Sequence, residues 1–166
     1  MMSIKIKSDL RKLEDRFGGI IKETFSTDRM STYAMFLSEL IKKRTRLGYG
    51  VKKDGGEKSP LKALSKGYKK TRKDSGKLSS LTSVNKSNLT FTGQLLNSLF
   101  GVGTSIGKGE VYIKEERNDG VQNSDIVDGQ EKKQGRSFFY VSKLEKQQLA
   151  NTARKDLLEY IKKNFN

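Results

Sequence analysis

The sequence predicts an α+β fold, with amphipathic helices at the N-terminal end, a central sheet that contains a β-hairpin, and a long C-terminal helix. Three observations lead to this fold class. Apolar residues recur every three or four positions in the first 45 residues and again after residue 142. Between these stripes, a glycine-rich stretch alternates apolar and polar residues on both sides of a Gly107-Lys108-Gly109 turn. We expect one domain in three segments: a helical hairpin over 1–50, a basic loop, helix and arm over 51–90, and an α+β core with the C-terminal helix over 91–166.

Two apolar stripes predict the N-terminal helices. The first covers residues 6–25 and contains two adjacent glycines at 18–19, where we expect a kink or a break. The second covers residues 30–41, and either Thr27 or Asp28 can cap its first turn. The short connection between the stripes is typical of a helical hairpin or of one long, bent helix.

The middle of the chain is rich in lysine, glycine and serine. Ser59 followed by Pro60, the only proline, is typical of an N-cap and first position of a helix. Leu61, Leu64 and Tyr68 would line one face of that helix. Residues 74–90 lack periodicity and are expected to form a linker or an arm that a partner orders.

A short helix is expected after this arm, followed by the hairpin. Thr92 is placed for an N-cap, and the next turn would bury Leu95, Leu96 and Leu99. The hairpin then occupies residues 101–114, and residues 117–135 are expected to be a polar loop.

The last part of the chain is an aromatic segment followed by a helix. "GRSFFYVS", residues 135–142, is strand-like in composition. Ser142 and Glu145 have the spacing of a capping box, which predicts the start of the C-terminal helix. The apolar stripe of that helix consists of Leu149, Ala153, Leu157, Ile161 and Phe165.

Composition excludes several classes of chemistry. The chain has no cysteine and no histidine, which removes disulfides, Ser-His-Asp and Cys-His catalysis and ordinary zinc sites. "GVGTSIGKG" lacks the first glycine and the final hydroxyl residue of a phosphate-binding loop, and Glu131-Lys132-Lys133 lacks the acidic strand residue of a nuclease. We therefore expect no enzyme, no catalytic residues, no cofactor and no metal. The start of the chain has no apolar core of a signal peptide, and no run approaches the roughly 20 apolar residues of a membrane helix.

Positive charge is the strongest compositional signal. The net charge is +15, and the region between residues 42 and 77 is dominated by lysine and arginine. A nucleic-acid-binding surface and a face that docks on an acidic protein explain this stretch equally well. No sequence signature of a sequence-specific nucleic-acid-binding domain accompanies it. The candidate basic surface consists of Lys42, Lys43, Arg44, Arg46, Lys52, Lys53, Lys69, Lys70, Arg72 and Lys73.

Four segments in order resemble a family of viral structural proteins. They are "LSKGYKKTRK" (64–73), "LTFTGQLLNSL" (89–99), the hairpin (101–114) and "GRSFFYVSKLE" (135–145), followed by the C-terminal helix. This order is similar to that of the tail-completion and head–tail joining (neck) proteins of tailed bacteriophages, which include lambdoid neck proteins and Mu-like virion morphogenesis proteins. Ser137 stands where that family has a proline, so its Arg-Pro-Phe element carries over only at Arg136 and Phe138.

The resemblance implies a non-enzymatic virion subunit. Such a subunit would be made in the cytoplasm of the bacterial host, form a homo-oligomeric ring, and join the portal or its adaptor to the tail, with contact to packaged DNA in the channel and none to a membrane. Residues 48–60 and 74–88 would be the loops that contact partners. Thr92, Gly93, Leu95 and Ser98 would build the short helix that seats the hairpin, and Arg136 and Phe138 would anchor the chain before the C-terminal helix. The alternative is non-specific nucleic-acid binding by the basic stretch.

Overall fold

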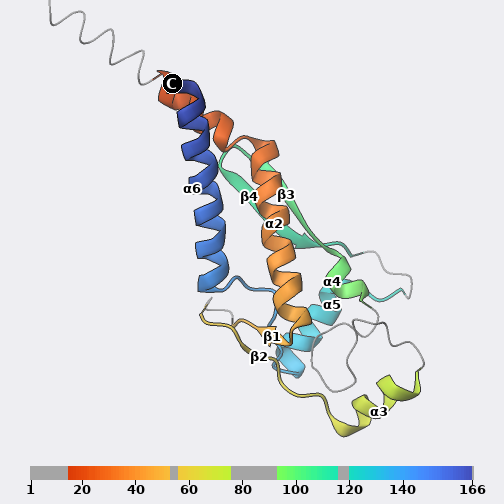
Figure 1. Cartoon of the computed structure of the whole chain (residues 1–166). Coiled ribbons are helices and arrows are strands. Elements are labelled where there is room, and N and C mark those ends of the chain that lie inside the picture. The colour runs from red at the N-terminus through yellow and green to blue at the C-terminus, as the bar shows by residue number, and fades with distance from the viewer. Residues whose placement is uncertain (1–14, 53–55, 76–92, 116–119, 166) are drawn as a thin grey trace, which may run out of the picture.

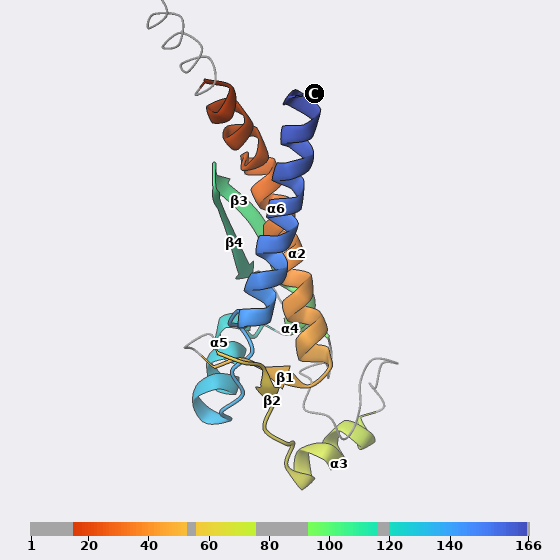
Figure 2. The ribbon, with the colours of Figure 1, turned by 60° about the vertical axis from the view of Figure 1, so that its left-hand side comes forward.

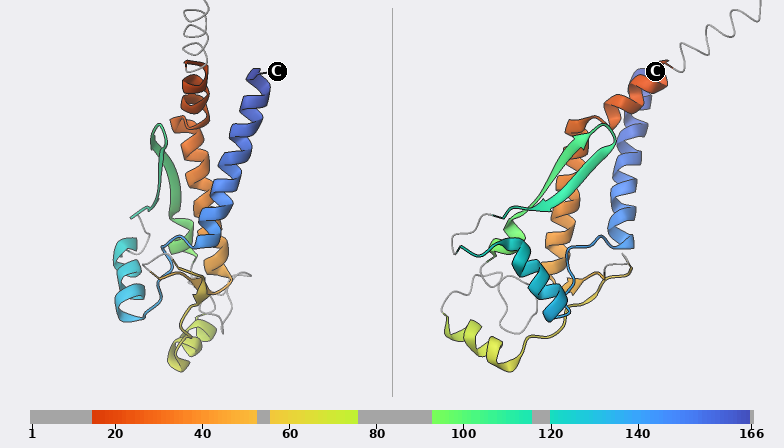
Figure 3. Two further views of the ribbon diagram at one scale, coloured as in Figure 1. Left: turned by 90° about the vertical axis from the view of Figure 1, so that its left-hand side faces the viewer. Right: turned by 180° about the vertical axis from the view of Figure 1, so that it is seen from behind.

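The computed structural model describes residues 15–52, 56–75, 93–115 and 120–165, and its fold is α+β (Figure 1). The central element is α2 (Thr27–Arg46), a helix of 20 residues. A hairpin of β3 (Leu99–Ser105) and β4 (Lys108–Ile113) packs along one side of α2. The long helix α6 (Lys143–Phe165) lies on the other side and runs in the opposite direction (Figures 1 and 3). The predicted fold class is confirmed.

The first helical segment, residues 15–24, leads into α2 through a bend at Phe25 and Ser26. The predicted break at Gly18 and Gly19 is wrong, because both glycines stay within the helix. Ser26 rather than Thr27 or Asp28 caps α2, and its hydroxyl accepts a hydrogen bond from the Arg29 amide at 3.5 Å. A glycine in a helix costs only about 1 kcal/mol relative to alanine, so the two glycines do not end the first helical segment. The boundary between that segment and α2 lies instead at the N-cap Ser26. Of the two predicted arrangements, the described residues form the bent helix, which Figure 2 shows from a second side.

The connection after α2 forms a second small sheet. β1 (Tyr49–Gly50) pairs antiparallel with β2 (Ser59–Pro60), and the prediction that Ser59 and Pro60 start a helix is wrong. Proline is tolerated here because a strand at the edge of a sheet does not need every amide hydrogen. The helix α3 (Lys66–Asp74) starts later, with Ser65 as its N-cap accepting from the Tyr68 amide at 3.2 Å.

The hairpin approaches α2 through a face made largely of glycine. A Cβ atom on Gly101 would lie 2.1 Å from the carbonyl carbon of Ala34, and one on Gly103 would lie 2.0 Å from the Thr27 carbonyl oxygen. These distances are far inside van der Waals contact, so any larger residue would separate the hairpin from the helix. Gly101 pairs with Val111 across the hairpin, which places Val111 on the same inner face.

The predicted hairpin is confirmed, but its turn lies one residue earlier than the sequence indicates. Ile106 and Gly107 form the turn, Gly107 has a φ of 73°, and Lys108 and Gly109 already belong to β4. The Gly107 amide donates to the Phe25 carbonyl at 2.8 Å, which ties the turn to the bend before α2.

The residues between the hairpin and α6 also differ from the prediction. Residues 117–135 are not only loop: α5 (Asn123–Asp128) continues into the π-helical turn η1 (Gly129–Lys133). Residues 135–142 form no strand. Their carbonyl groups accept isolated hydrogen bonds instead of the regular series that pairs two strands. The Ser137 carbonyl, for example, accepts from the Val51 amide at 3.0 Å.

The main core lies where the lower half of α2, the short helix α4 (Gln94–Asn97) and the segment before α6 meet. We call this cluster the junction. Its apolar members are exposed by 9% or less, and partly buried side chains from β4 and α5 surround them. The junction consists of Ile41, Leu61, Leu95, Leu96, Leu99 and Phe138.

Candidate functional site

Two of the four segments that the sequence singled out contribute side chains to the junction. Leu61 lies just before the first segment, Leu95, Leu96 and Leu99 come from the second, and Phe138 from the fourth. The hairpin packs against the same cluster through Val111 and Ile113. Segments that lie far apart in the chain therefore share one core.

Phe138 fills the centre of this core. Its side chain is 1% exposed, and its ring lies 6.4 Å from that of Phe139. Burying a phenylalanine contributes roughly 1.5–3 kcal/mol relative to leaving it in water. The prediction that Phe138 anchors the chain before α6 agrees with this position.

Arg136 ties the segment before α6 to the loop before α3. Its guanidinium donates to the backbone carbonyls of Lys62 at 3.0 Å and Ala63 at 3.1 Å, and to the Gln130 side-chain oxygen at 3.1 Å. The side chain is 7% exposed. Burial lowers the pKa of Arg136; the Tyr68 hydroxyl acts in the opposite direction, and the nearby Arg72 charge lowers the pKa further. Arg136 uses its charge inside the fold rather than on the surface.

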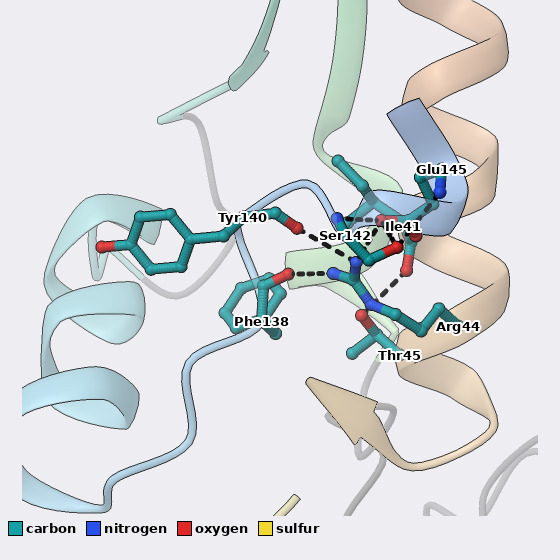
Figure 4. A network of polar contacts seen from close by, with 7 residues as sticks. All are labelled: Ile41, Arg44, Thr45, Phe138, Tyr140, Ser142 and Glu145. Carbon is teal, nitrogen blue, oxygen red and sulfur yellow. Dashed lines mark hydrogen bonds and ion pairs between the residues drawn. The ribbon is translucent and has the colours of Figure 1, made fainter. Parts of the chain in front are cut away.

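Arg44 makes a second and more deeply buried connection (Figure 4). One terminal nitrogen donates to the Glu145 carboxylate at 2.5 Å and to the Tyr140 carbonyl at 3.0 Å, and the other donates to the Phe138 carbonyl at 2.5 Å. Both charged side chains are 6% exposed. Burial lowers the pKa of Arg44, and the Glu145 charge and hydrogen bond partly offset that shift.

Glu145 also completes the predicted capping box. Its carboxylate accepts from the Ser142 amide and the Ser142 hydroxyl, both at 2.8 Å, and the Ser142 hydroxyl accepts from the Glu145 amide at 3.2 Å. The capping box at the start of α6 is confirmed. The same carboxylate thus orders the first turn of α6 and joins it to α2 through Arg44.

Leu95 and Ser98, two of the residues predicted to seat the hairpin, lie at α4 next to it. Leu95 is buried in the junction, and the Ser98 hydroxyl donates to the Leu95 carbonyl at 2.8 Å. The Ser98 carbonyl accepts from the Lys114 amide at 3.0 Å and so joins α4 to the hairpin. Gly93 is the N-cap of α4 in a left-handed conformation with φ 73°, where the sequence had predicted Thr92. Thr92 itself lies outside the described residues.

The predicted basic surface is interrupted by burial. Arg44 and Arg72 are 6% and 1% exposed, so they do not belong to a surface. Lys42 is half-buried and pairs with Glu39 at 2.6 Å, and Arg46 donates to the Asn97 side chain at 3.3 Å. Lys43, Lys52, Lys70 and Lys73 are exposed, Lys69 is half-buried, and Lys53 lies outside the described residues.

The burial of Arg44 could have been anticipated from the sequence. It follows Ile41 by three positions and Leu40 by four, so the helical period places it next to the apolar stripe of α2. The identity of its partner could not have been read in the same way, because Glu145 lies 101 positions later.

The chemistry of this site is structural. The donors of Arg44 and Arg136 are directed at backbone carbonyls and at side chains of neighbouring segments. A cavity of about 470 Å³ lies beside Arg136, between the loop before α3 and η1, and no carboxylate lines it. Within the described ranges, no three acidic residues gather to hold a metal ion, and no helix is long and apolar enough to cross a membrane.

Comparison of the chain with protein-family models, with curated proteins and with solved structures finds no match.

Proposed function

We propose that this chain is a structural subunit of the head–tail connector of a tailed bacteriophage, which assembles into a ring and joins the portal or its adaptor to the tail. The observation that carries the proposal is the convergence at the junction. The second and fourth of the segments that resemble neck proteins supply most of one core, and the hairpin packs against it. The fourth segment also contains Arg136, whose guanidinium makes buried contacts to the loop before α3. A core to which three of these segments contribute or against which they pack gives a physical reason for their occurrence in that order.

The shape of the molecule also supports an assembly role. The chain is elongated, and α6 extends beside α2 far beyond the junction (Figures 1 and 2). Large apolar side chains remain exposed along this length, among them Phe17, Ile21, Ile106 and Leu158 at 41–59%. Apolar surface of this kind is typical of proteins that bury it against neighbours.

Co-expression with the portal, adaptor and tail proteins of its own virus tests the proposal. We expect the chain to co-purify with at least one of them, to form rings in electron micrographs, and to be detected by mass spectrometry in purified virions. A chain that stays monomeric and binds none of these proteins would refute the proposal.

Non-specific nucleic-acid binding is the second candidate, and α3 is the feature that favours it. Lys66, Lys70 and Lys73 are exposed on this helix, and the Tyr68 ring is 39% exposed. Phosphate contacts release counterions, so this function predicts binding to a DNA duplex that weakens steeply as salt increases. An absence of binding at low salt would exclude it.

A further inference from the structure

A small cavity lies between the C-terminal end of α2 and the N-terminal end of α6. Its volume is about 180 Å³. Leu47 and Leu144 are 56% and 48% exposed beside it, which is unusual for leucines that line one hollow. The apolar part of its wall consists of Leu40, Leu47, Tyr49 and Leu144.

The rim of this cavity is positively charged. Lys43 and Lys58 are exposed there, and the Lys58 ammonium lies 5.3 Å from the centre of the Tyr49 ring. Arg44 and Glu145 also line the cavity, and as a buried ion pair they neutralise one another. The two lysines therefore give the cavity a net positive charge, and we call it the basic cavity. An apolar side chain within an acidic surrounding would complement it.

The same chain carries such a surface around α5. Val121 is 46% exposed, and Glu115, Asp125 and Asp128 are exposed near it in the sequence. The described residues of 115–128 include three carboxylates and no lysine or arginine, and Asp128 also pairs with Lys132 of η1 at 2.6 Å. We call Glu115, Val121, Asp125 and Asp128 the acidic ridge.

The acidic ridge and the basic cavity lie on different sides of the molecule. In the left panel of Figure 3, α5 lies at one side, and the lower ends of α2 and α6 lie toward the other. The backbone that carries the ridge is therefore separate from the helix ends that border the cavity.

We propose that the acidic ridge of one copy docks into the basic cavity of the next, with Val121 between Leu47 and Leu144 and Asp125 facing Lys43 and Lys58. This inference rests on the ring assembly proposed above and names the interface that builds it. The two surfaces differ, so the contact is heterologous, and repetition of such a contact closes into a ring or extends as a filament. Opposite charges would set the direction in which the copies join.

Two variants test the two surfaces separately. Leu144→Glu places a negative charge in the cavity, and the double variant V121N/D125N removes the apolar and acidic groups of the ridge. All three positions are exposed, so both variants should fold like the wild type. Met35→Glu, at an exposed position in the middle of α2, and Glu159→Gln, on an exposed part of α6, are matched controls away from both surfaces.

Sedimentation and native mass spectrometry of the full chain give the readout. We expect the wild type and both controls to self-associate, and each interface variant to associate at least about tenfold more weakly. A mixture of the two interface variants should give a complex of two chains, because only one ridge and one cavity remain competent. Self-association should also weaken when salt rises to roughly 0.5 M.

The outcomes separate this interface from the proposed function. If the wild type assembles and the interface variants assemble equally well, the interface is refuted while ring assembly stands. If the wild type is monomeric alone and with its virion partners, both the interface and the ring are refuted. If the mixture of variants forms no two-chain complex, the head-to-tail pairing is refuted.

Discussion

The two ends of the molecule are held together by different interactions. At the junction end, Leu96, Leu99 and Phe138 are at most 1% exposed, and the Arg44–Glu145 pair is buried beside them. At the distal end, residues 15–24 and the hairpin turn lie near the end of α6 (Figure 1). Ile20 is buried there, and polar contacts also join the helices. Tyr33 donates to Asp156 at 2.8 Å, Arg16 to the Asn164 carbonyl at 2.5 Å, and Tyr160 to Glu23.

This difference indicates which end folds without help. Apolar burial is the dominant favourable term in folding, whereas exposed polar contacts each contribute little. The predicted stripe of α6 illustrates the contrast, because Leu149, Ala153, Leu157 and Ile161 are only half-buried, and the side chain of Phe165 lies outside the described residues. The junction supplies most of the apolar burial, and large apolar side chains such as Phe17 and Ile106 stay exposed at the distal end.

The largest expected effect is at the junction. Phe138→Ala should lower the free energy of unfolding by about 3–5 kcal/mol, because it leaves a cavity where the ring was enclosed. Chemical denaturation measures this quantity. Phe36→Ala on α2, where the ring is 37% exposed, is the matched control and should change it by at most about 1 kcal/mol. Equal losses at the two positions would contradict the contrast between a core and a surface.

The buried ion pair should give a comparable effect. Glu145→Leu leaves the Arg44 charge buried without its carboxylate and should lower the free energy of unfolding by about 3 kcal/mol. Replacing both groups in R44M/E145L should cost less than Glu145→Leu alone, since no unpaired charge remains in the core. A double-mutant cycle by denaturation measures the coupling, and additive losses would show that the two residues act independently.

The smallest effect is expected between α2 and the distal half of α6. Tyr33→Phe removes the hydrogen bond to Asp156 and should cost about 1–2 kcal/mol. Burial, then the hydrogen bond and charge of Asp156, raise the pKa of Tyr33 to about 12, with a smaller opposing effect from Arg29. Its contribution to stability is therefore complete below the unfolded pKa of about 10 and is lost as the pH rises through about 12. Chemical denaturation at about pH 8 and pH 11 measures this contribution, and the free energy of unfolding should change less between the two pH values in the variant than in the wild type.

Elements that depend on neighbours in the sequence could be predicted well. The stripe of α2, the capping box at Ser142 and Glu145, and the alternation of the hairpin all follow from periods and caps within a few residues. The wrong predictions concern residues whose conformation depends on hydrogen bonds to a segment far away in the sequence. Ser59 and Pro60 pair with Tyr49 and Gly50 instead of starting a helix, and the backbone before α6 bonds to Arg44 instead of a strand.

By itself, the sequence determined the fold class, the extent of α2 and α6, the hairpin and the start of α6. These features rest on the helical and strand periods and on local hydrogen bonds, which need no knowledge of the rest of the chain. Only the tertiary structure decided that Arg44 pairs with Glu145, that Arg72 leaves the basic surface and that glycines form the inner face of the hairpin. It also decided that two of the segments resembling neck proteins share one core, against which the hairpin packs. The physical reason is that burial depends on which residues meet in space, and Arg44 meets its carboxylate 101 positions away.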